Sequence, residues 1–134
     1  MNRRFTRKFL FTFSVSILFM FFHESVSAQN KDLVVHIAKL QIDPAQLDNY
    51  KVALKEHAET AVRLEPGVLT LYAVYEKDHP THVTVFEIYA DSTAYKSHLQ
   101  SAHFLKYKAA TKDMVKSLEL ISAVPIALEG KFKN

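Results

Sequence analysis

The chain of 134 residues contains no cysteine and no tryptophan, and it has only two glycines. Without cysteine, disulfide bonds, thiolate metal sites and cysteine nucleophiles are all excluded. Two glycines leave no room for a glycine-rich loop that cradles phosphate groups. The sequence also lacks GxGxxG, P-loop, HExxH and GxSxG motifs. These absences argue against the common nucleotide-dependent, zincin and serine-hydrolase classes of enzyme.

The first 28 residues have the pattern of a secretory signal peptide. Four basic residues, Arg3 to Lys8, precede an apolar run at positions 9–22, and small residues lead up to Ala28. The run is shorter than the roughly 20 residues that a membrane-spanning helix needs. We therefore predict cleavage after Ala28, an exported bacterial protein that is periplasmic or secreted, and no membrane contact after the leader is removed.

Removal of this leader changes the charge balance. The leader holds four of the 17 basic residues and one of the 14 acidic residues, so residues 29–134 carry 13 of each sign. A neutral domain without a basic patch gives no reason to expect nucleic acid binding. No linker, repeat or low-complexity segment interrupts residues 29–134, which we interpret as one domain with one hydrophobic core.

The pattern of apolar residues predicts four strands, at residues 33–42, 68–76, 82–90 and 118–128. Helices are predicted at 44–64, 93–99 and 102–115, with Asp43, Asp91 and Ser101 as N-caps. This β-α-β-β-α-β order is typical of the ferredoxin-like α+β fold, an antiparallel sheet with its helices on one face. Both faces of the strands are apolar, whereas helices cover only one, so we predict a homodimer whose sheets pack face to face.

The segment HLQSAHFLKY, residues 98–107, places His98 and His103 five positions apart. On one continuous helix this spacing separates the two rings by about 140°, whereas helical metal ligands usually lie four residues apart. No nearby Asp or Glu completes a third ligand, so we predict no metal site. The segment instead resembles a junction in which His98 ends one helix and Ser101 caps the next.

Several residues together resemble the antibiotic biosynthesis monooxygenase (ABM) family, and especially its small quinol monooxygenases. These residues are Glu65-Pro66-Gly67, the strand end Phe86 to Asp91, and then Ala94, His98, Ser101, His103 and Phe104. The resemblance covers about residues 33–128. It implies a dimeric α+β barrel and oxidation of phenolic or quinol-like compounds by O2 without flavin, haem or metal. The absence of tryptophan, and of an asparagine on the expected strand, departs from the haem-degrading relatives.

Such chemistry needs a base that forms the reactive anion, in an apolar pocket with a donor near the developing oxyanion. We therefore predict catalytic roles for His98, His103 and Glu87. The substrate pocket is predicted to include His36, His57, Tyr72, Tyr75 and Phe104. No cofactor is expected, and the expected partners are a small aromatic molecule and O2.

Other interpretations remain open at this stage. Each histidine, His57 on the apolar helix stripe above all, can equally be a core residue held by a neighbour, and Glu87 can be a solvated strand-end charge. The same pocket also fits a module that binds or senses an aromatic ligand without turnover. An isomerase that transfers a proton on a small carbonyl compound would need the same base.

Overall fold

The computed structural model describes residues 32–131, so the predicted signal peptide and its cleavage bond lie outside the described residues. The chain order is β1 (Val34–Ile42), the 3-10 turn η2 (Pro44–Gln46), α1 (Leu47–Leu64), β2 (Val68–Tyr75), β3 (His82–Tyr89), α2 (Ser92–Gln100), α3 (Ala102–Thr111) and β4 (Val115–Ala123). This is the predicted ferredoxin-like order, with its second helix split in two.

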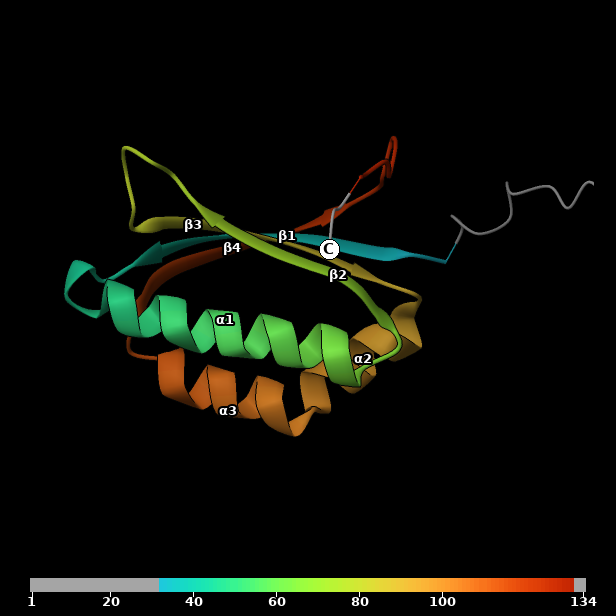
Figure 1. Cartoon of the computed structure of the whole chain (residues 1–134), viewed down its shortest axis with the longest axis horizontal. Helices are drawn as coiled ribbons and strands as arrows, with labels where there is room; N and C mark the ends of the chain where they lie inside the picture. Colours follow the sequence, from blue (N-terminus) through green and yellow to red (C-terminus); the bar gives the residue numbers. More distant parts are fainter. Residues whose placement is uncertain (1–31, 132–134) are drawn as a thin grey trace, which may run out of the picture.

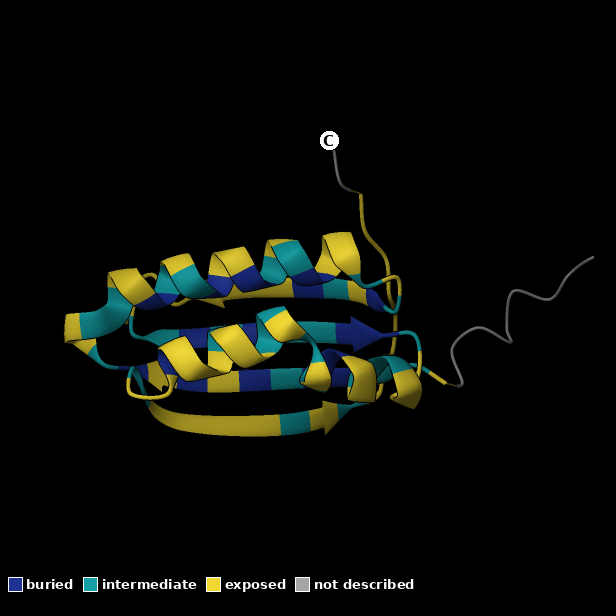
Figure 2. Cartoon of the chain, turned by 90° about the horizontal axis from the view of Figure 1, so that it is seen from below, coloured by how far each residue is buried: buried dark blue, intermediate teal, exposed yellow. Residues whose placement is uncertain are grey.

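The strands form one antiparallel sheet in the order β2-β3-β1-β4. All three helical segments lie on one face of this sheet, with α1 and α3 side by side (Figure 1). Helix α1 buries a stripe formed by Tyr50, Leu54, His57 and Ala61, whereas the edge strand β4 stays largely exposed (Figure 2). The space between sheet and helices holds the hydrophobic core, in which Ile42, Tyr50, Ala61 and Tyr89 are almost fully buried.

The helix starts are fixed by short polar side chains, as the sequence predicts. The Asp43 carboxylate accepts a hydrogen bond from the backbone N–H of Ala45 at 2.9 Å, and Asp91 accepts one from Ala94 at 2.8 Å. Ser101 Oγ accepts from the Phe104 N–H at 3.3 Å. These bonds satisfy amide groups that the first helical turn leaves without partners.

The last strand differs from its predicted position, because it runs over Val115–Ala123 and not over 118–128. Helix α3 correspondingly ends at Thr111, where the Thr111 hydroxyl donates to the Tyr107 carbonyl at 2.8 Å and a turn follows. The strand stops at Ala123 because its partner β1 begins at Val34 and Pro125 has no N–H to donate. An irregularity between Val68 and Thr70 also puts Val68 on the same face as Leu71, which simple alternation does not predict.

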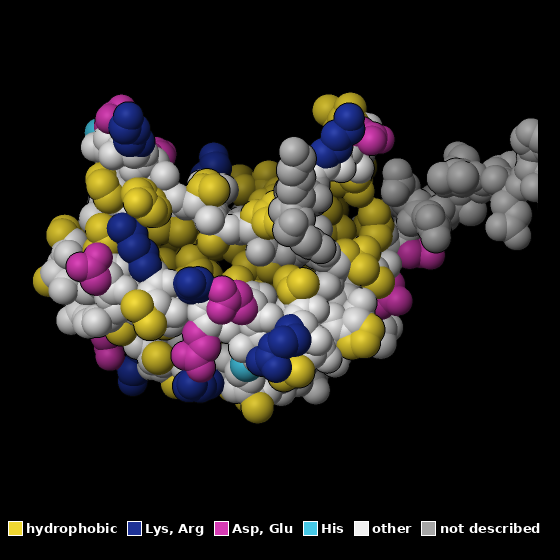
Figure 3. All heavy atoms as spheres, viewed as in Figure 1, with side chains coloured by type: hydrophobic (Ala, Val, Ile, Leu, Met, Phe, Trp, Pro, Cys, Tyr) yellow, Lys and Arg dark blue, Asp and Glu magenta, His cyan; other side chains and the backbone are white. Residues whose placement is uncertain are grey.

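The sheet face away from the helices carries an apolar row across all four strands. The row consists of four residues that are paired from strand to strand. In sheet order they are Tyr72 (β2), Phe86 (β3), Ile37 (β1) and Ile121 (β4). Hydrophobic side chains gather in a hollow on this face, between the β2–β3 hairpin and the C-terminal segment (Figure 3). Among residues 32–131, no helix is long and apolar enough to cross a membrane.

Candidate active site

A cavity of about 170 Å³ lies between the sheet and the helices. Its wall is mostly apolar, with Ala38, Leu40, Val85, Leu118 and Leu120 from the sheet and Leu54, Leu99 and Phe104 from the helices. The polar groups on the wall are His57, Glu87, Lys108 and the tyrosines Tyr89, Tyr95 and Tyr107. An apolar pocket with a few convergent polar groups is the usual form of a small-molecule site.

Glu87 supplies the carboxyl group of this cavity. It lies mid-strand on the helix-facing side of β3, in register with Val83, Val85 and Tyr89 as the alternation predicts. Burial raises the pKa of Glu87 above its usual value, and a hydrogen bond from Tyr89 offsets only part of that effect. A carboxyl group with a raised pKa is a potential proton donor near neutral pH.

His57 supplies the imidazole, from the centre of the buried stripe of α1. Its side chain is 4 % exposed and stacks on the Tyr107 ring, with centroids 4.7 Å apart and planes at 10°. Burial, together with the neighbouring His98 and His103, lowers the pKa of His57 to about 4. His57 is therefore neutral near pH 7 and can accept a proton.

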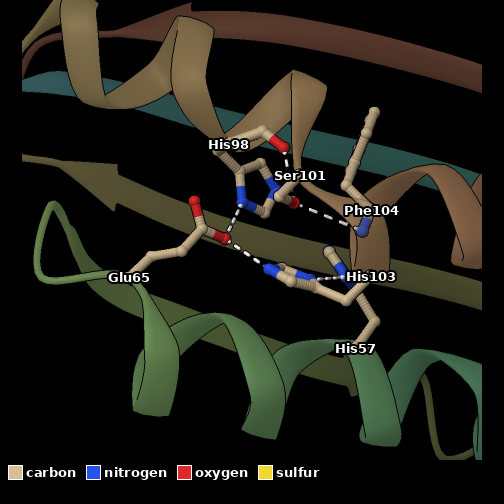
Figure 4. A network of polar contacts seen from close by, with 6 residues as sticks. All are labelled: His57, Glu65, His98, Ser101, His103 and Phe104. Carbon is tan, nitrogen blue, oxygen red and sulfur yellow. Dashed lines mark hydrogen bonds and ion pairs between the residues drawn. The ribbon is translucent and has the colours of Figure 1, made fainter.

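Behind His57 lies a cluster of two further histidines and one glutamate, formed by His103, His98 and Glu65 (Figure 4). His57 Nδ1 lies 3.1 Å from His103 Nδ1. The Glu65 carboxylate oxygen Oε1 lies 2.6 Å from His103 Nε2 and 2.8 Å from His98 Nδ1. The end of α1 thus meets the junction between α2 and α3, and Glu65 and His98 are 33 positions apart in sequence.

The break between α2 and α3 brings both histidines to Glu65. Ser101 ends α2 in an extended conformation, its hydroxyl donates to the His98 carbonyl at 2.8 Å, and its oxygen then caps α3. The predicted junction is therefore confirmed. It removes the 140° separation that one continuous helix would impose on His98 and His103.

The prediction that no acidic residue stands near these histidines is wrong, because Glu65 reaches them from α1. The three side chains could in principle hold a metal ion. The 2.8 Å separation between His98 and Glu65 is, however, that of a charge-assisted hydrogen bond, and the 2.6 Å separation between His103 and Glu65 is that of a direct ion pair. A proton shared with the carboxylate accounts for them.

Proton positions in the cluster follow from the acceptors. A carboxylate only accepts, so His98 donates its Nδ1–H to Glu65. Burial lowers the pKa of His98, which keeps the ring neutral and leaves Nε2 without a proton. Glu65 also faces His103 Nε2, so the proton of the His103 ring lies on that nitrogen. His103 Nδ1 then has no proton and accepts the hydrogen bond from His57 Nδ1–H. His57 Nε2 is then the free basic nitrogen.

Tyrosines complete the surroundings of the cavity. The hydroxyl groups of Tyr50 and Tyr107 are hydrogen-bonded at 2.8 Å. Burial raises the pKa of Tyr50, Tyr89, Tyr95 and Tyr107 above the usual value for tyrosine. All four are therefore protonated at neutral pH and can donate hydrogen bonds.

The predicted site residues fall into three groups. Glu87, His57 and Phe104 line the cavity, while His98 and His103 stand behind His57. His36 is buried on the same sheet face, opposite Glu87 in register and 4.6 Å from the Tyr95 ring. Tyr75 lies in a separate groove of about 350 Å³, where Lys51 Nζ sits 3.9 Å over its ring, and Tyr72 lies on the open sheet face.

Sequence reasoning missed Glu65, Tyr89, Tyr95 and Tyr107 as members of the site. In the sequence, Glu65 stands out only as the first residue of Glu65-Pro66-Gly67, a segment that contributes to the family resemblance and carries no predicted role in the site. Tyr89 shares its strand face with Glu87, so alternation alone could have placed it. Tyr95 and Tyr107 lie on two different helices, and no spacing in the sequence relates them.

This fold and this cavity define a ferredoxin-like α+β protein with a small-molecule pocket between its sheet and its helices. The ABM (antibiotic biosynthesis monooxygenase) family model matches residues 33–110. The chain belongs to the antibiotic biosynthesis monooxygenase family, as the sequence resemblance indicates.

Solved structures agree with this assignment. A protein from Bacteroides thetaiotaomicron assigned as an antibiotic biosynthesis monooxygenase is 52% identical, with a TM-score of 0.74 over 78% of this chain and 99% of that one. A Nitrosomonas europaea protein assigned to the same group is 20% identical and shares the fold, with a TM-score of 0.68 over 74% of this chain and 95% of that one. An assigned monooxygenase from Lactobacillus acidophilus is 26% identical, with a TM-score of 0.67 over 68% of this chain and 43% of that one. No curated protein matches the chain.

Proposed function

We propose that this protein is an exported monooxygenase that oxidises a small phenolic or quinol-like compound with O2 and needs no cofactor. The observation that carries the proposal is the pair of titratable groups on one apolar cavity wall. Burial lowers the pKa of His57 to about 4 and raises the pKa of Glu87. Two groups whose pKa values are pushed in opposite directions are suited to act as base and acid at the same pH.

In this proposal His57 Nε2 removes the phenolic proton. The resulting anion is electron-rich and reacts with O2, which is the step that the neutral phenol does not perform. For a quinol, one oxygen atom enters the ring and the other leaves as water, so the product is a hydroxyquinone and all electrons come from the substrate. Glu87, in its protonated form, and the tyrosine hydroxyl groups donate hydrogen bonds to the developing oxyanion.

The residues behind His57 act in this scheme as positioning residues, because they do not line the cavity and influence it through His57. They are His103, Glu65 and His98. When His57 takes a proton on Nε2, its Nδ1 proton can pass to His103 Nδ1, 3.1 Å away. The charge then rests on His103 beside the Glu65 carboxylate, 2.6 Å from Nε2. A carboxylate behind an imidazole stabilises its charged form and fixes the orientation of the ring.

The size of the cavity supports a single-ring substrate. Its volume of about 170 Å³ is below the roughly 300–1,000 Å³ of pockets that hold drug-sized ligands. Membership of the ABM family favours oxygenation over isomerisation, although the acid and base would serve both reactions.

An oxygen electrode with a panel of hydroquinones and other monocyclic phenols tests the proposal. We expect O2 uptake above the uncatalysed rate. His57→Gln should reduce it by about 10² to 10⁴, the usual contribution of a general base. Lys55→Gln is the matched control, because Lys55 lies on the exposed face of the same helix. A compound that is isomerised without O2 uptake would indicate an isomerase and contradict the oxygenase proposal. A compound that only raises the melting temperature would indicate a binding protein without turnover.

We further propose that the protein is a homodimer and that it is exported. The apolar row on the open sheet face supports the dimer, because a sheet face of this composition needs cover from water. The export proposal depends on the leader sequence alone. Mass spectrometry of protein recovered from the periplasm or medium should show a chain that begins at Gln29.

A further inference from the structure

The β2–β3 hairpin carries a second group of potential metal ligands, which lies outside the cavity. Glu76 ends β2, His79 lies in the turn, and His82 begins β3. Oε2 of Glu76 lies 3.4 Å from Nδ1 of His79 and 3.4 Å from Nδ1 of His82. One ligand atom from each residue lies within 4.8 Å of the others. The proposed function uses none of these residues.

The two histidine-glutamate groups of this protein differ in their spacing. In the cluster behind His57 the nitrogen-oxygen distances are 2.6 and 2.8 Å, which fit a shared proton. In a tetrahedral zinc site with bonds of about 2.0–2.1 Å, neighbouring ligand atoms are about 3.3–3.4 Å apart. In the hairpin group, both distances from Glu76 to the histidines have this value, and they are too long for good hydrogen bonds.

The backbone holds these three residues in place without a metal. The His82 N–H donates to the His79 carbonyl at 2.9 Å, which closes a β-turn with Pro80 at its second position. The Glu76 N–H donates to the His82 carbonyl at 3.0 Å, and the Ile42 N–H ties the turn to β1 through the Thr81 carbonyl at 2.9 Å. Little chain entropy is then lost when an ion binds, which favours affinity.

The ligand chemistry indicates the class of ion. Two imidazoles and one carboxylate suit a divalent ion of intermediate softness such as Zn²⁺, whereas Mg²⁺ and Ca²⁺ prefer oxygen ligands. The imidazole rings of His79 and His82 stack at 5.4 Å with planes at 19°, so their edges can face one ion together. The side chains of Glu76, His79 and His82 are 57%, 68% and 45% exposed, so the ion can enter from solvent.

We propose that Glu76, His79 and His82 form a zinc site that fastens the β2–β3 hairpin, with water at the fourth tetrahedral position. The site does not depend on the proposed oxygenase activity.

Isothermal titration of the untagged protein with ZnCl2 at neutral pH tests the proposal. We expect one zinc ion per chain at this site. His79→Ala, His82→Ala and Glu76→Gln should each weaken binding by at least about tenfold. Asp78→Asn is the matched control: it removes an acidic group of the same hairpin that does not belong to the ligand set, and it should leave affinity unchanged. Zinc should also raise the melting temperature of the native chain and not that of His79→Ala.

Three outcomes would overturn the proposal. The first is zinc binding that survives in the His79→Ala/His82→Ala double variant, in which case His103→Gln would test the cluster behind His57. The second is a loss of zinc affinity in Asp78→Asn as large as the loss in the ligand variants. That result would mean that zinc is attracted to the overall charge of the hairpin and not held by defined ligands. The third is binding only at millimolar zinc. These substitutions lie on the surface, so circular dichroism should show that every variant is folded.

Discussion

The Glu65 carboxylate accepts a hydrogen bond from His98 at 2.8 Å, which joins the end of α1 to the end of α2. The same oxygen atom touches His103 on α3. One glutamate therefore holds together the three helical segments that cover the sheet, and it also sets the positions of the rings behind His57.

Replacement of Glu65 by glutamine should lower the free energy of unfolding by about 1.5–3 kcal/mol, the range for hydrogen bonds to charged groups. The glutamine side chain has no charge to stabilise His103. Its NH2 group is also a hydrogen-bond donor, and it cannot accept a hydrogen bond from a histidine N–H as a carboxylate oxygen does. Urea unfolding measures the change. Glu59→Gln is the control, because its ion pair with Lys55 spans 3.7 Å on the exposed face of the same helix. Equal stability of both variants would contradict a structural role for the Glu65 cluster.

The buried His57 should make the protein less stable in acid. Its pKa in the folded chain is about 4, below the value of about 6.5 in the unfolded chain, so the unfolded state binds the proton first as the pH falls. The stability is complete above about pH 6.5 and is lost progressively toward pH 4, by about 3 kcal/mol from this group. His57→Gln should flatten this dependence, whereas Lys55→Gln, on the exposed face of the same helix, should not. Chemical denaturation at several pH values gives the slopes, and parallel slopes for native protein and His57→Gln would contradict the assignment.

Glu87 should act as a proton-bearing donor and not as a base. Because burial raises its pKa, the carboxyl group keeps its proton to a higher pH than an ordinary glutamate does. Glu87→Gln also presents a donor, so it should retain most O2 uptake, whereas Glu87→Ala should lose it. Infrared spectra of the native protein should contain a protonated carboxyl band that is absent in Glu87→Gln. Equal loss of activity in both variants would instead indicate that the carboxylate form is required.

Gly67 should tolerate no side chain, because a Cβ atom there would lie 2.4 Å from the Cβ of Ala94. Gly67→Ala is expected to destabilise the fold by about 1–3 kcal/mol, as overpacked positions usually do. The displaced helix α2 carries His98, so O2 uptake should fall as well. The Gly67→Ala/Ala94→Gly double variant should regain part of this loss in a double-mutant cycle. Strictly additive effects would mean that the two residues do not meet.

The open sheet face should support a dimer, and Ile121→Asp should break it. Ile121 lies at one end of the apolar row that crosses the sheet through Ile37, and a buried carboxylate without a partner is costly. Sedimentation velocity should find a dimer for the native chain and a monomer for the variant. Leu105→Asp, on an exposed position of α3, should remain dimeric. A native protein that sediments as a monomer at micromolar concentration would refute the dimer.

The sequence by itself determined the local structure of this protein. Short apolar runs and the caps Asp43, Asp91 and Ser101 are short-range signals, so the order of elements and the ferredoxin-like class follow from them. The break at Ser101 could be predicted for the same reason. The end of β4 could not, because it depends on where the partner strand β1 begins.

Only the tertiary structure decided which residues meet. Glu65 lies 33 positions from His98, and no periodicity links a helix stop to a helix junction. His57 was visible as a histidine on an apolar stripe, but its place between the cavity and His103 depends on how α1 packs against α3. The shifts in pKa have the same origin, because burial and neighbouring charges exist only once the helices have closed over the sheet.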